Sequence, residues 1–448
     1  MRQNKERKTT ILTLGIPIFI QLMLFNLLST VDTLMISNYN EAYIISMNNA
    51  SSIIHMINVL LSICSTGVGI VIAQYLGAKQ KEDAKISFNN GLIFNLLLSV
   101  VLFAILFFLK EPLLKMIDCP EENLNDAIKY VSIIAFGIPL NALVNIVSTN
   151  LRVHKKPGFI TLVGVISNII NVFLNYVLIY GKFNFPELGI EGAAIATISS
   201  QVIMLVLGLI FSPIILKDKI YKLSISYKHL YKIISIGLPS ALESFCYTLS
   251  SLFVTAAINQ LTDAEMLARA YINIIALYIY QFSIAFGQAN SILVGHLVGQ
   301  NDYVKAKKRT YSSYLLCFPI LLMLIILLNI FGEHIFYFMS KSNEESELII
   351  SFALSVLPWL FLYETGRCIN LIFINSLKAS GDVIYPLISA IICMFIFSSL
   401  GSWVLGIYCN LGFLGIFLAQ ALDEVVRAIL MLFRWANNKW MNKSIVNK

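Results

Sequence analysis

A single carboxylate, Asp32, lies inside a largely apolar stretch that covers residues 15–38. An acidic side chain in the middle of a membrane helix costs about 2.5–3.5 kcal/mol on insertion scales, so its presence indicates a function. With about 3.6 residues per helical turn, Gln21 and Phe25 lie on the same face as Asp32. Burial in an apolar cavity disfavours the charged form of a carboxylate, so Asp32 can take up a proton or hold Na⁺. We therefore predict that Asp32 binds a coupling cation, with a purely structural role as the alternative.

Two further apolar segments carry amide side chains at helical spacing, so that each set lies on one face. The amides are Asn141 and Asn145 in the first segment, and Asn168, Asn171 and Asn175 in the second. Together with Gln21, they predict a hydrated substrate cavity that faces Asp32. The alternative is that they join helices through hydrogen bonds, each worth about 0.6 kcal/mol in a membrane.

The second half of the chain carries different charges. Val254 stands 222 residues after Asp32, where a repeat of the acid would fall. The candidate charges are Glu243, and Glu364 with Arg367, which are close enough on a helix to form an ion pair. We predict structural pairing for Glu364 and Arg367, whereas Glu243 fits a cavity or the cytoplasmic end of its helix equally well. A further set of polar side chains is placed to line the path: Tyr247, Gln281 and Gln288.

The elements that position these residues follow from composition. With 58% hydrophobic and 13% charged residues and a mean hydropathy of +0.78, the chain of 448 residues lacks the polar surface of a soluble globule. A helix needs about 20 apolar residues to cross a bilayer. The sequence has about twelve such runs, at residues 11–37, 45–75, 88–109, 127–151, 159–180, 191–215, 232–260, 268–298, 311–332, 346–376, 383–405 and 412–434. Because the runs lack the alternation of barrel strands, we predict an all-α polytopic membrane protein with twelve transmembrane helices.

Lysine and arginine between these runs fall mainly on one side. Taking the N-terminus as that side, 24 basic residues lie there and five lie opposite. Cytoplasmic loops carry such an excess, so we predict that both termini are cytoplasmic. The first apolar run is longer than a signal sequence and lacks a small-residue cleavage site, which predicts a retained span. Topology thus explains the net charge of +7, and we predict no nucleic-acid partner.

Catalytic chemistry finds little support in the sequence. The seven cysteines are scattered without a CxxC pair, so neither a metal cluster nor a disulfide framework is predicted. No GxxxxGK(S/T) phosphate loop is present, so we predict that this chain does not hydrolyse ATP. If it pumps a substrate, an ion gradient must supply the energy. A membrane-embedded enzyme would need convergent His, Cys or paired acidic residues, so we predict no enzymatic activity and no cofactor.

The chain repeats itself at an offset of 222 residues. GIP at residues 15–17 recurs as GLP at residues 237–239, and IVIAQYLGAKQKEDAK recurs as ILVGHLVGQNDYVKAK. An even number of spans per half gives both halves the same orientation, with a substrate path between them. We predict an N-terminal six-helix lobe, a cytoplasmic linker and a C-terminal six-helix lobe at residues 1–216, 217–231 and 232–448. A duplicated bundle without a transport role is the alternative.

In order and spacing, a series of motifs resembles the multidrug and toxic compound extrusion (MATE) family, and within it the DinF-type bacterial branch. The motifs are GIP followed by VDTLMI, VIAQYLGAKQKEDA, LRVHKKP, GIEGAAIAT, ILVGHLVGQND and LKASGD, and they span essentially the whole chain. The resemblance implies two pseudosymmetric lobes, V-shaped around a central cavity. It also implies antiport of organic cations or other amphiphiles against H⁺ or Na⁺ across the plasma (inner) membrane of a bacterium.

The resemblance extends to individual residues. The helix-bending proline of the family matches Pro17, and its first-lobe acid matches Asp32. Its fifth-helix motif falls on Asn171 and Asn175, so the second acid of several members is absent here. Where the NorM-type branch has a tenth-helix acid, this chain has Arg367. Coupling is therefore expected to depend on Asp32.

These features predict an exchange mechanism. Asp32 is loaded with the coupling cation from outside, its neutralisation relaxes the first helix about Pro17, and the substrate is expelled. One acid cannot hold a cationic substrate and the coupling cation together, and this competition is the exchange. The 13 methionines and many aromatic residues suit a yielding pocket for a small amphiphilic or cationic substrate.

The alternative function is that of a flippase for a lipid-linked or polysaccharide precursor. A flippase would need a cavity rich in Arg and Lys to bind phosphate, whereas we identify only Arg367 clearly within a span. For either function we expect a monomer embedded in the lipid bilayer.

Overall fold

The computed structural model describes residues 10–117, 119–216, 225–339 and 344–446. Within these residues the chain is helical and contains no strand, which confirms the predicted all-α membrane fold. Some of the predictions fall outside the described residues: those for the basic residues at 2–8, for residues 217–224 of the linker, and for Lys341 and Lys448.

The chain divides into two compact units. The first comprises Met1–Leu76 and Gln80–Leu238, and the second comprises Gly77–Lys79 and Pro239–Lys448. The predicted division into two six-helix lobes around a linker stays a proposal. Helix α8 begins at Tyr227, so the last residues of that linker are helical.

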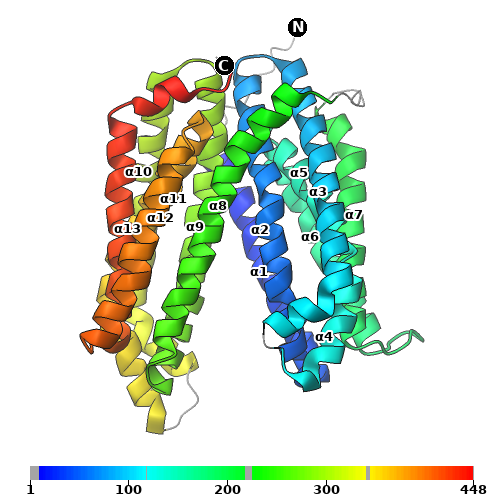
Figure 1. The fold of residues 1–448 in the computed structure, drawn as a ribbon, viewed down its shortest axis with the longest axis vertical. Coiled ribbons are helices and arrows are strands. Elements are labelled where there is room, and N and C mark those ends of the chain that lie inside the picture. The colour runs from blue at the N-terminus through cyan, green and yellow to red at the C-terminus, as the bar shows by residue number, and fades with distance from the viewer. Residues whose placement is uncertain (1–9, 118, 217–224, 340–343, 447–448) are drawn as a thin grey trace. The chain divides into compact units, whose positions relative to one another are not determined.

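The first unit contains seven helices and the start of an eighth (Figure 1). They are α1 (Ile11–Tyr39), α2 (Ala42–Gly77), α3 (Lys81–Met116), α4 (Glu121–Ile134), α5 (Gly137–Val153), α6 (Pro157–Ile179), α7 (Ile190–Leu216) and the first part of α8 (Tyr227–Ile258). Helix α1 lies along α6, and α5 packs between α3 and α7. One apolar core cluster draws residues from all seven helices, among them Ile36, Leu106, Val131, Ile179 and Ala194. This shared core holds α1 and α6, which carry most of the candidate residues of the first unit, together.

The second unit contains the rest of α8 and the remaining helices (Figure 1). They are α9 (Asp263–Gly299), α10 (Tyr303–Met339), α11 (Glu344–Ser380), α12 (Ile384–Cys393), the π-helical segments η1 (Met394–Leu400) and η2 (Ser402–Tyr408), α13 (Gly412–Ala436) and the short 3-10 helix η3 (Lys439–Lys443). Helix α11 packs against both α9 and α13. Glu364 and Arg367, two of the candidate residues, therefore lie on a helix with packed neighbours on two sides.

Ten of the described helices are long and apolar enough to cross a membrane, and the bent pair α4 and α5 brings the number to eleven if it forms one span. The single helix that we predicted at residues 127–151 is thus two helices that meet at 47°. Pro139 explains the break, because it has no N–H for the carbonyl group one turn earlier. Helix α13 is the other long helix among the described residues. It covers the predicted run 412–434 but carries four charged residues, Asp423, Glu424, Arg427 and Arg434, and is not among those ten.

Helix α1 begins where a threonine caps it. The hydroxyl of Thr10 accepts a hydrogen bond from the backbone N–H of Thr13 at 3.3 Å. The hydroxyl of Thr13 in turn accepts a hydrogen bond from the backbone N–H of Thr10. This reciprocal capping box satisfies two polar groups at the start of the helix. The helix then continues through Pro17 to Tyr39, so Asp32 is presented from regular helical backbone.

Glycines permit close contact between α2 and the start of α8 in the first unit. A Cβ atom on Gly67 would collide with the backbone carbonyl of Ile233, and one on Gly237 would collide with that of Ile63. Small residues allow helix backbones to approach closely in membranes. Gly237 of the repeated GLP motif therefore has a packing role.

Substituting Gly237→Val should lower the free energy of unfolding by about 1–3 kcal/mol, the usual cost of overpacking. The added side chain meets backbone, which cannot swing aside. Thermal melting of the detergent-solubilised protein measures the loss, and Gly158→Val, at a helical glycine with open space around it, serves as the control. Equal melting temperatures for the two variants would contradict the packing role.

Candidate functional site

Asp32 is held by an amide of the neighbouring helix α6. The side-chain nitrogen of Asn175 donates a hydrogen bond to Oδ1 of Asp32 at 2.5 Å. The same nitrogen donates to Oδ1 of Asn171, one turn earlier, at 3.0 Å. Both amides are 0% exposed, whereas Asp32 is half-buried. The structure thus brings together three of the residues that we predicted from sequence.

Two atoms of this amide pair are buried without a hydrogen-bond partner in the described part of the chain: Oδ1 of Asn175 and Nδ2 of Asn171. An unpaired buried polar atom costs about 1–3 kcal/mol, so its presence in a native site requires a reason. An amide oxygen accepts hydrogen bonds and ligates cations. Asn175 therefore offers a free acceptor beside the carboxylate.

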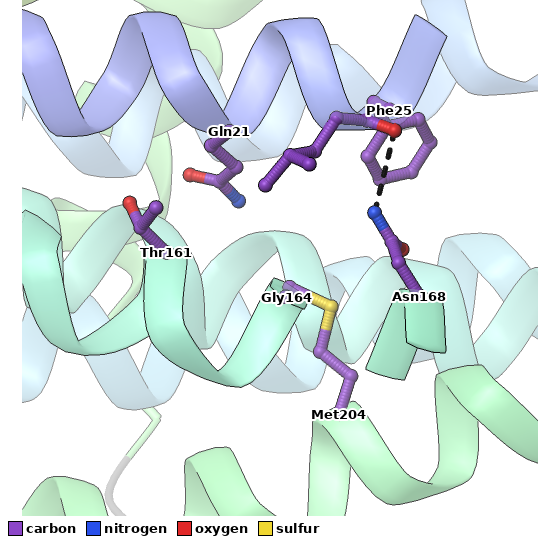
Figure 2. Close-up of a pocket in the computed structure, with 7 residues that line it drawn as sticks. Gln21, Phe25, Thr161, Gly164, Asn168 and Met204 are labelled. Atoms are coloured by element: carbon purple, nitrogen blue, oxygen red, sulfur yellow. Dashed lines mark hydrogen bonds between the residues drawn. The ribbon is translucent and has the colours of Figure 1, made fainter. Parts of the chain in front are cut away.

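A small pocket opens against α1 on the N-terminal side of Asp32 (Figure 2). Its lining consists of Gln21, Leu24, Phe25, Thr161, Gly164, Asn168 and Met204. Gln21 accepts a hydrogen bond from Nη2 of Arg152 at 2.9 Å. Figure 2 shows the Asn168 side chain pointing at the α1 backbone, where it donates to the carbonyl of Leu24 at 3.3 Å. The mixture of amides with apolar side chains suits an amphiphilic group.

The amides of α5 make a separate contact. Asn141 donates to Oδ1 of Asn58 on α2 at 2.8 Å, and Asn145 donates to Asn141 at 3.2 Å. Asn58 has no amide companion at helical spacing on its own helix, so no pattern in the sequence marked it as a candidate. The predicted amides therefore form two separate groups. Those of α6 contact α1, and those of α5 contact α2.

The second unit contains a buried charge cluster between α11 and α13. Arg367 pairs with Glu364 at 2.9 Å and lies 3.7 Å from Glu424. It also donates to the hydroxyl of Tyr363, and its guanidinium lies 4.9 Å from the centre of the Tyr280 ring. The ion pair that we expected between Glu364 and Arg367 is present, and it belongs to a larger network.

Helix α13 supplies three charges of this network that were not among the residues predicted from sequence. Arg427 contacts Asp423 at 2.7 and 3.0 Å, and Glu424 at 2.9 Å. The available signal was their spacing of three and four residues inside the predicted span 412–434. Arg427 also corrects the expectation that Arg367 is the only arginine clearly within a span.

The cluster contains one more carboxylate than guanidinium groups. Its three acids are Glu364, Asp423 and Glu424, and Oε2 of Glu364, a residue that is 0% exposed, has no hydrogen-bond partner within the described residues. A net charge in an apolar interior is costly, so the unmatched carboxylate is most stable as the neutral acid. We assign the proton of this neutral acid to Glu364, and the network as a whole is then neutral.

The other candidates of the second unit have different surroundings. Glu243 lies near the middle of α8 and pairs with Lys378 at 2.8 Å, which gives its carboxylate a structural partner. Tyr247 is 43% exposed, and Gln281 and Gln288 are half-buried. Among the residues that the structure describes, no group of three or more His, Cys, Asp or Glu side chains is arranged to hold a metal ion.

A comparison with protein families identifies the chain by two matches. The family model described as MatE matches residues 17–177 and again residues 239–404. The matches begin at Pro17 and Pro239, the two prolines that the internal repeat relates. Together they cover more than half of the chain, and they confirm the resemblance found in the sequence.

Several bacterial transporters are similar to the chain over most of their length. It is 30% identical to the uncharacterised transporter YisQ of Bacillus subtilis, across 99% of this chain and 98% of the relative. It is 24% identical to a probable multidrug resistance protein NorM of Thermotoga maritima, across 99% and 95%. It is 23% identical to the multidrug resistance protein NorM of Vibrio cholerae, across 86% and 84%. The placement in the DinF-type branch stays a prediction.

Solved structures share the fold. A MOP superfamily transporter from Pyrococcus furiosus has a TM-score of 0.86 to this chain at 20% identity, with 98% of this chain and 96% of the other covered. An outward-facing multidrug resistance transporter of the MATE family also has a TM-score of 0.86 at 20% identity, with 96% of both chains covered. These likenesses confirm the predicted MATE-like fold.

Substituting Arg367→Met should destabilise the protein by about 3–5 kcal/mol, because it leaves buried carboxylates without their cation. Glu364→Gln should cost less than about 1 kcal/mol, because glutamine reproduces the shape of a neutral carboxylic acid. Thermal melting of both variants in detergent makes the comparison. An equally large loss for Glu364→Gln would show that this carboxylate is charged and would overturn the assignment of the proton.

Proposed function

The chain belongs to the MatE family, and we propose that within it this protein exports organic cations or other amphiphilic compounds from the cytoplasm in exchange for H⁺ or Na⁺. Relatives named as multidrug resistance proteins support the substrate class. The proposal includes a monomer in the plasma membrane of a bacterium, cytoplasmic termini, and two six-helix lobes joined at residues 217–231. It includes no cofactor and no enzymatic activity.

One observation carries the proposal: Asp32 is a membrane acid whose partner is the neutral amide of Asn175. An acid that faces Arg or Lys is neutralised permanently. An acid that faces an amide must obtain its counter-charge from a cation that comes and goes. The unpartnered oxygen of Asn175 supports this reading, because it can accept a hydrogen bond from the O–H of the protonated acid or ligate Na⁺.

The second unit supports the placement of coupling in the first. At Arg367, where the resemblance puts an acid in the NorM-type branch, a guanidinium is already bound by Glu364 and Glu424. A mobile cation would have to displace a group that is covalently attached to the chain. Exchange at Asp32 meets no such competitor among the contacts of the described residues.

The exchange follows from competition, because the coupling cation and a cationic substrate both require the single negative charge of Asp32. Loading of Asp32 from outside neutralises it, which removes the attraction for a cationic substrate and allows α1 to relax about Pro17. The pocket at Gln21 and Phe25 changes shape with α1, because both residues belong to that helix. The substrate then leaves, and release of the coupling cation to the cytoplasm restores the carboxylate.

The flippase alternative needs cationic groups that are free to hold phosphate. Both arginines of the cluster in the second unit, Arg367 and Arg427, are bound by carboxylates. Arg152 in the first unit contacts the amide of Gln21. A headgroup of more than one phosphate would therefore have to break ion pairs, which favours the antiporter.

Substituting Asp32→Asn should abolish gradient-driven efflux, a loss of at least about 100-fold in rate, since the amide cannot take up a proton and carries no negative charge for a cation. Dye efflux from vesicles under separately imposed proton and sodium gradients measures it and also identifies the coupling ion. The matched control is Glu41→Gln, which removes an exposed acid just after the same helix. Wild-type efflux by well-inserted Asp32→Asn would refute coupling at this residue.

Substituting Asn175→Leu should raise the cation concentration for half-maximal efflux about tenfold, the value of one charge-assisted hydrogen bond. Titration of efflux against external H⁺ or Na⁺ provides the measurement. Asn329→Leu is the control, because the Asn329 amide donates to the carbonyl of Ile325 on its own helix α10, in the other unit. An unchanged midpoint in Asn175→Leu would exclude Asn175 from the cation site.

A further inference from the structure

Helices α1 and α6 stay in register along four hydrogen bonds. Residues of α6 and its C-terminal cap bond residues of α1 at sequence separations of 144, 144, 143 and 145: Thr161 to Pro17, Asn168 to Leu24, Asn175 to Asp32 and Tyr180 to Met35. A nearly constant separation means that two helices run parallel and advance together. The contact therefore extends continuously from Pro17 past Asp32.

Most of these bonds end on the α1 backbone. The Thr161 hydroxyl donates to the carbonyl of Pro17 at 2.9 Å, and the Asn168 amide donates to the carbonyl of Leu24 at 3.3 Å. A carbonyl oxygen has two lone pairs, so it can accept such a bond in addition to its helical bond. These donors therefore fix the position of the α1 backbone whatever side chains α1 carries.

The donors share one face of α6. Thr161, Asn168 and Asn175 follow one another at intervals of seven residues, about two helical turns, so they point in the same direction. The next residues along the helix, Leu162 and Ile169, are 57% and 65% exposed. Helix α6 thus offers polar donors to α1 and keeps apolar side chains on a different face.

The first contact coincides with the weakest turn of α1. Pro17 has no N–H, so the helix lacks one of its own hydrogen bonds at this turn. The Thr161 hydroxyl bonds Pro17 here, and it also lies 3.1 Å from the carbonyl of Pro157 on its own helix. The Thr161 hydroxyl thus lies within hydrogen-bond distance of a carbonyl on each of the two helices.

We propose that Thr161 and Asn168 are positioning residues that hold the N-terminal half of α1 in register with α6, so that Asp32 meets Asn175. This inference rests on the proposed coupling role of Asp32. It gives Asn168 a different role from the one expected from sequence, where it lines a substrate cavity. The Asn168 amide acts on Asp32 through the α1 backbone rather than on the substrate.

The test compares donor removal with changes on the exposed face of the same helix. The double variant Thr161→Val/Asn168→Leu removes both donors at similar volume. The matched control is Leu162→Val/Ile169→Leu, one residue further along at each site. The conservative variant Thr161→Ser keeps the hydroxyl and is compared with the single variant Thr161→Val.

Hydrogen exchange of the α1 amides, measured by mass spectrometry on the full protein in nanodiscs, is the first readout. Loss of both donors should speed exchange between Pro17 and Leu24 about tenfold, at about threefold for each interhelical bond. The control and Thr161→Ser should exchange like the parent. The second readout is the pH or Na⁺ profile of efflux, whose midpoint should shift in the double variant and stay at the parent's value in the control.

Two results would overturn the proposal. One is α1 exchange in the double variant that equals that of the parent. The other is a raised KM with an unshifted pH or Na⁺ profile, which would make Asn168 a substrate contact. Failure of the coupling role is distinguishable, because Asp32→Asn would then keep its gradient-driven efflux while the exchange of α1 amides still reports on the donors.

Discussion

Hydrocarbon offers no hydrogen-bond partner, so a polar group within a membrane helix is costly unless the protein or a bound ligand supplies one. The buried contacts of both units supply such partners. In the first unit the contacts are largely between neutral groups, because the donors of α6 bond carbonyl groups and one carboxylate of α1. In the second unit the contacts are ionic, because carboxylates of α11 and α13 pair with guanidinium groups of the same two helices.

Ion pairs and hydrogen bonds to neutral groups have different consequences for function. A network of ion pairs holds its partners permanently, and removal of one member leaves a buried charge behind. A carboxylate that is bonded to an amide keeps its need for a counter-charge. Bonds between helices in a membrane are worth only about 0.6 kcal/mol each, so a helix held by a few of them can move. The buried acid of the first unit is therefore held by a neutral amide, whereas the buried acids of the second unit are held by ion pairs.

Helical spacing predicted which residues share a face, but it did not say which helix that face meets. The stripes on α5 and α6 are equally regular in sequence, yet Asn141 reaches Asn58 on α2 while Asn175 reaches Asp32 on α1. Backbone acceptors such as the carbonyl of Leu24 have no signature in the sequence at all, because every residue has one. Asp423 and Arg427 had a signature in their spacing, but they lie in a run chosen for its apolar residues. Tertiary packing selects among faces that the sequence leaves equivalent.

The internal repeat distinguishes residues that both halves share from Asp32, which only the first half has. Pro17 and Pro239 recur at the same offset and begin the two family matches, so they belong to the architecture of both halves. The acid does not recur: the position equivalent to Asp32 is Val254, which is 0% exposed. An unpaired carboxylate there would carry the full cost of a buried charge. With Arg367 as a tethered cation in the second half, the two copies share their prolines but differ in their buried charges.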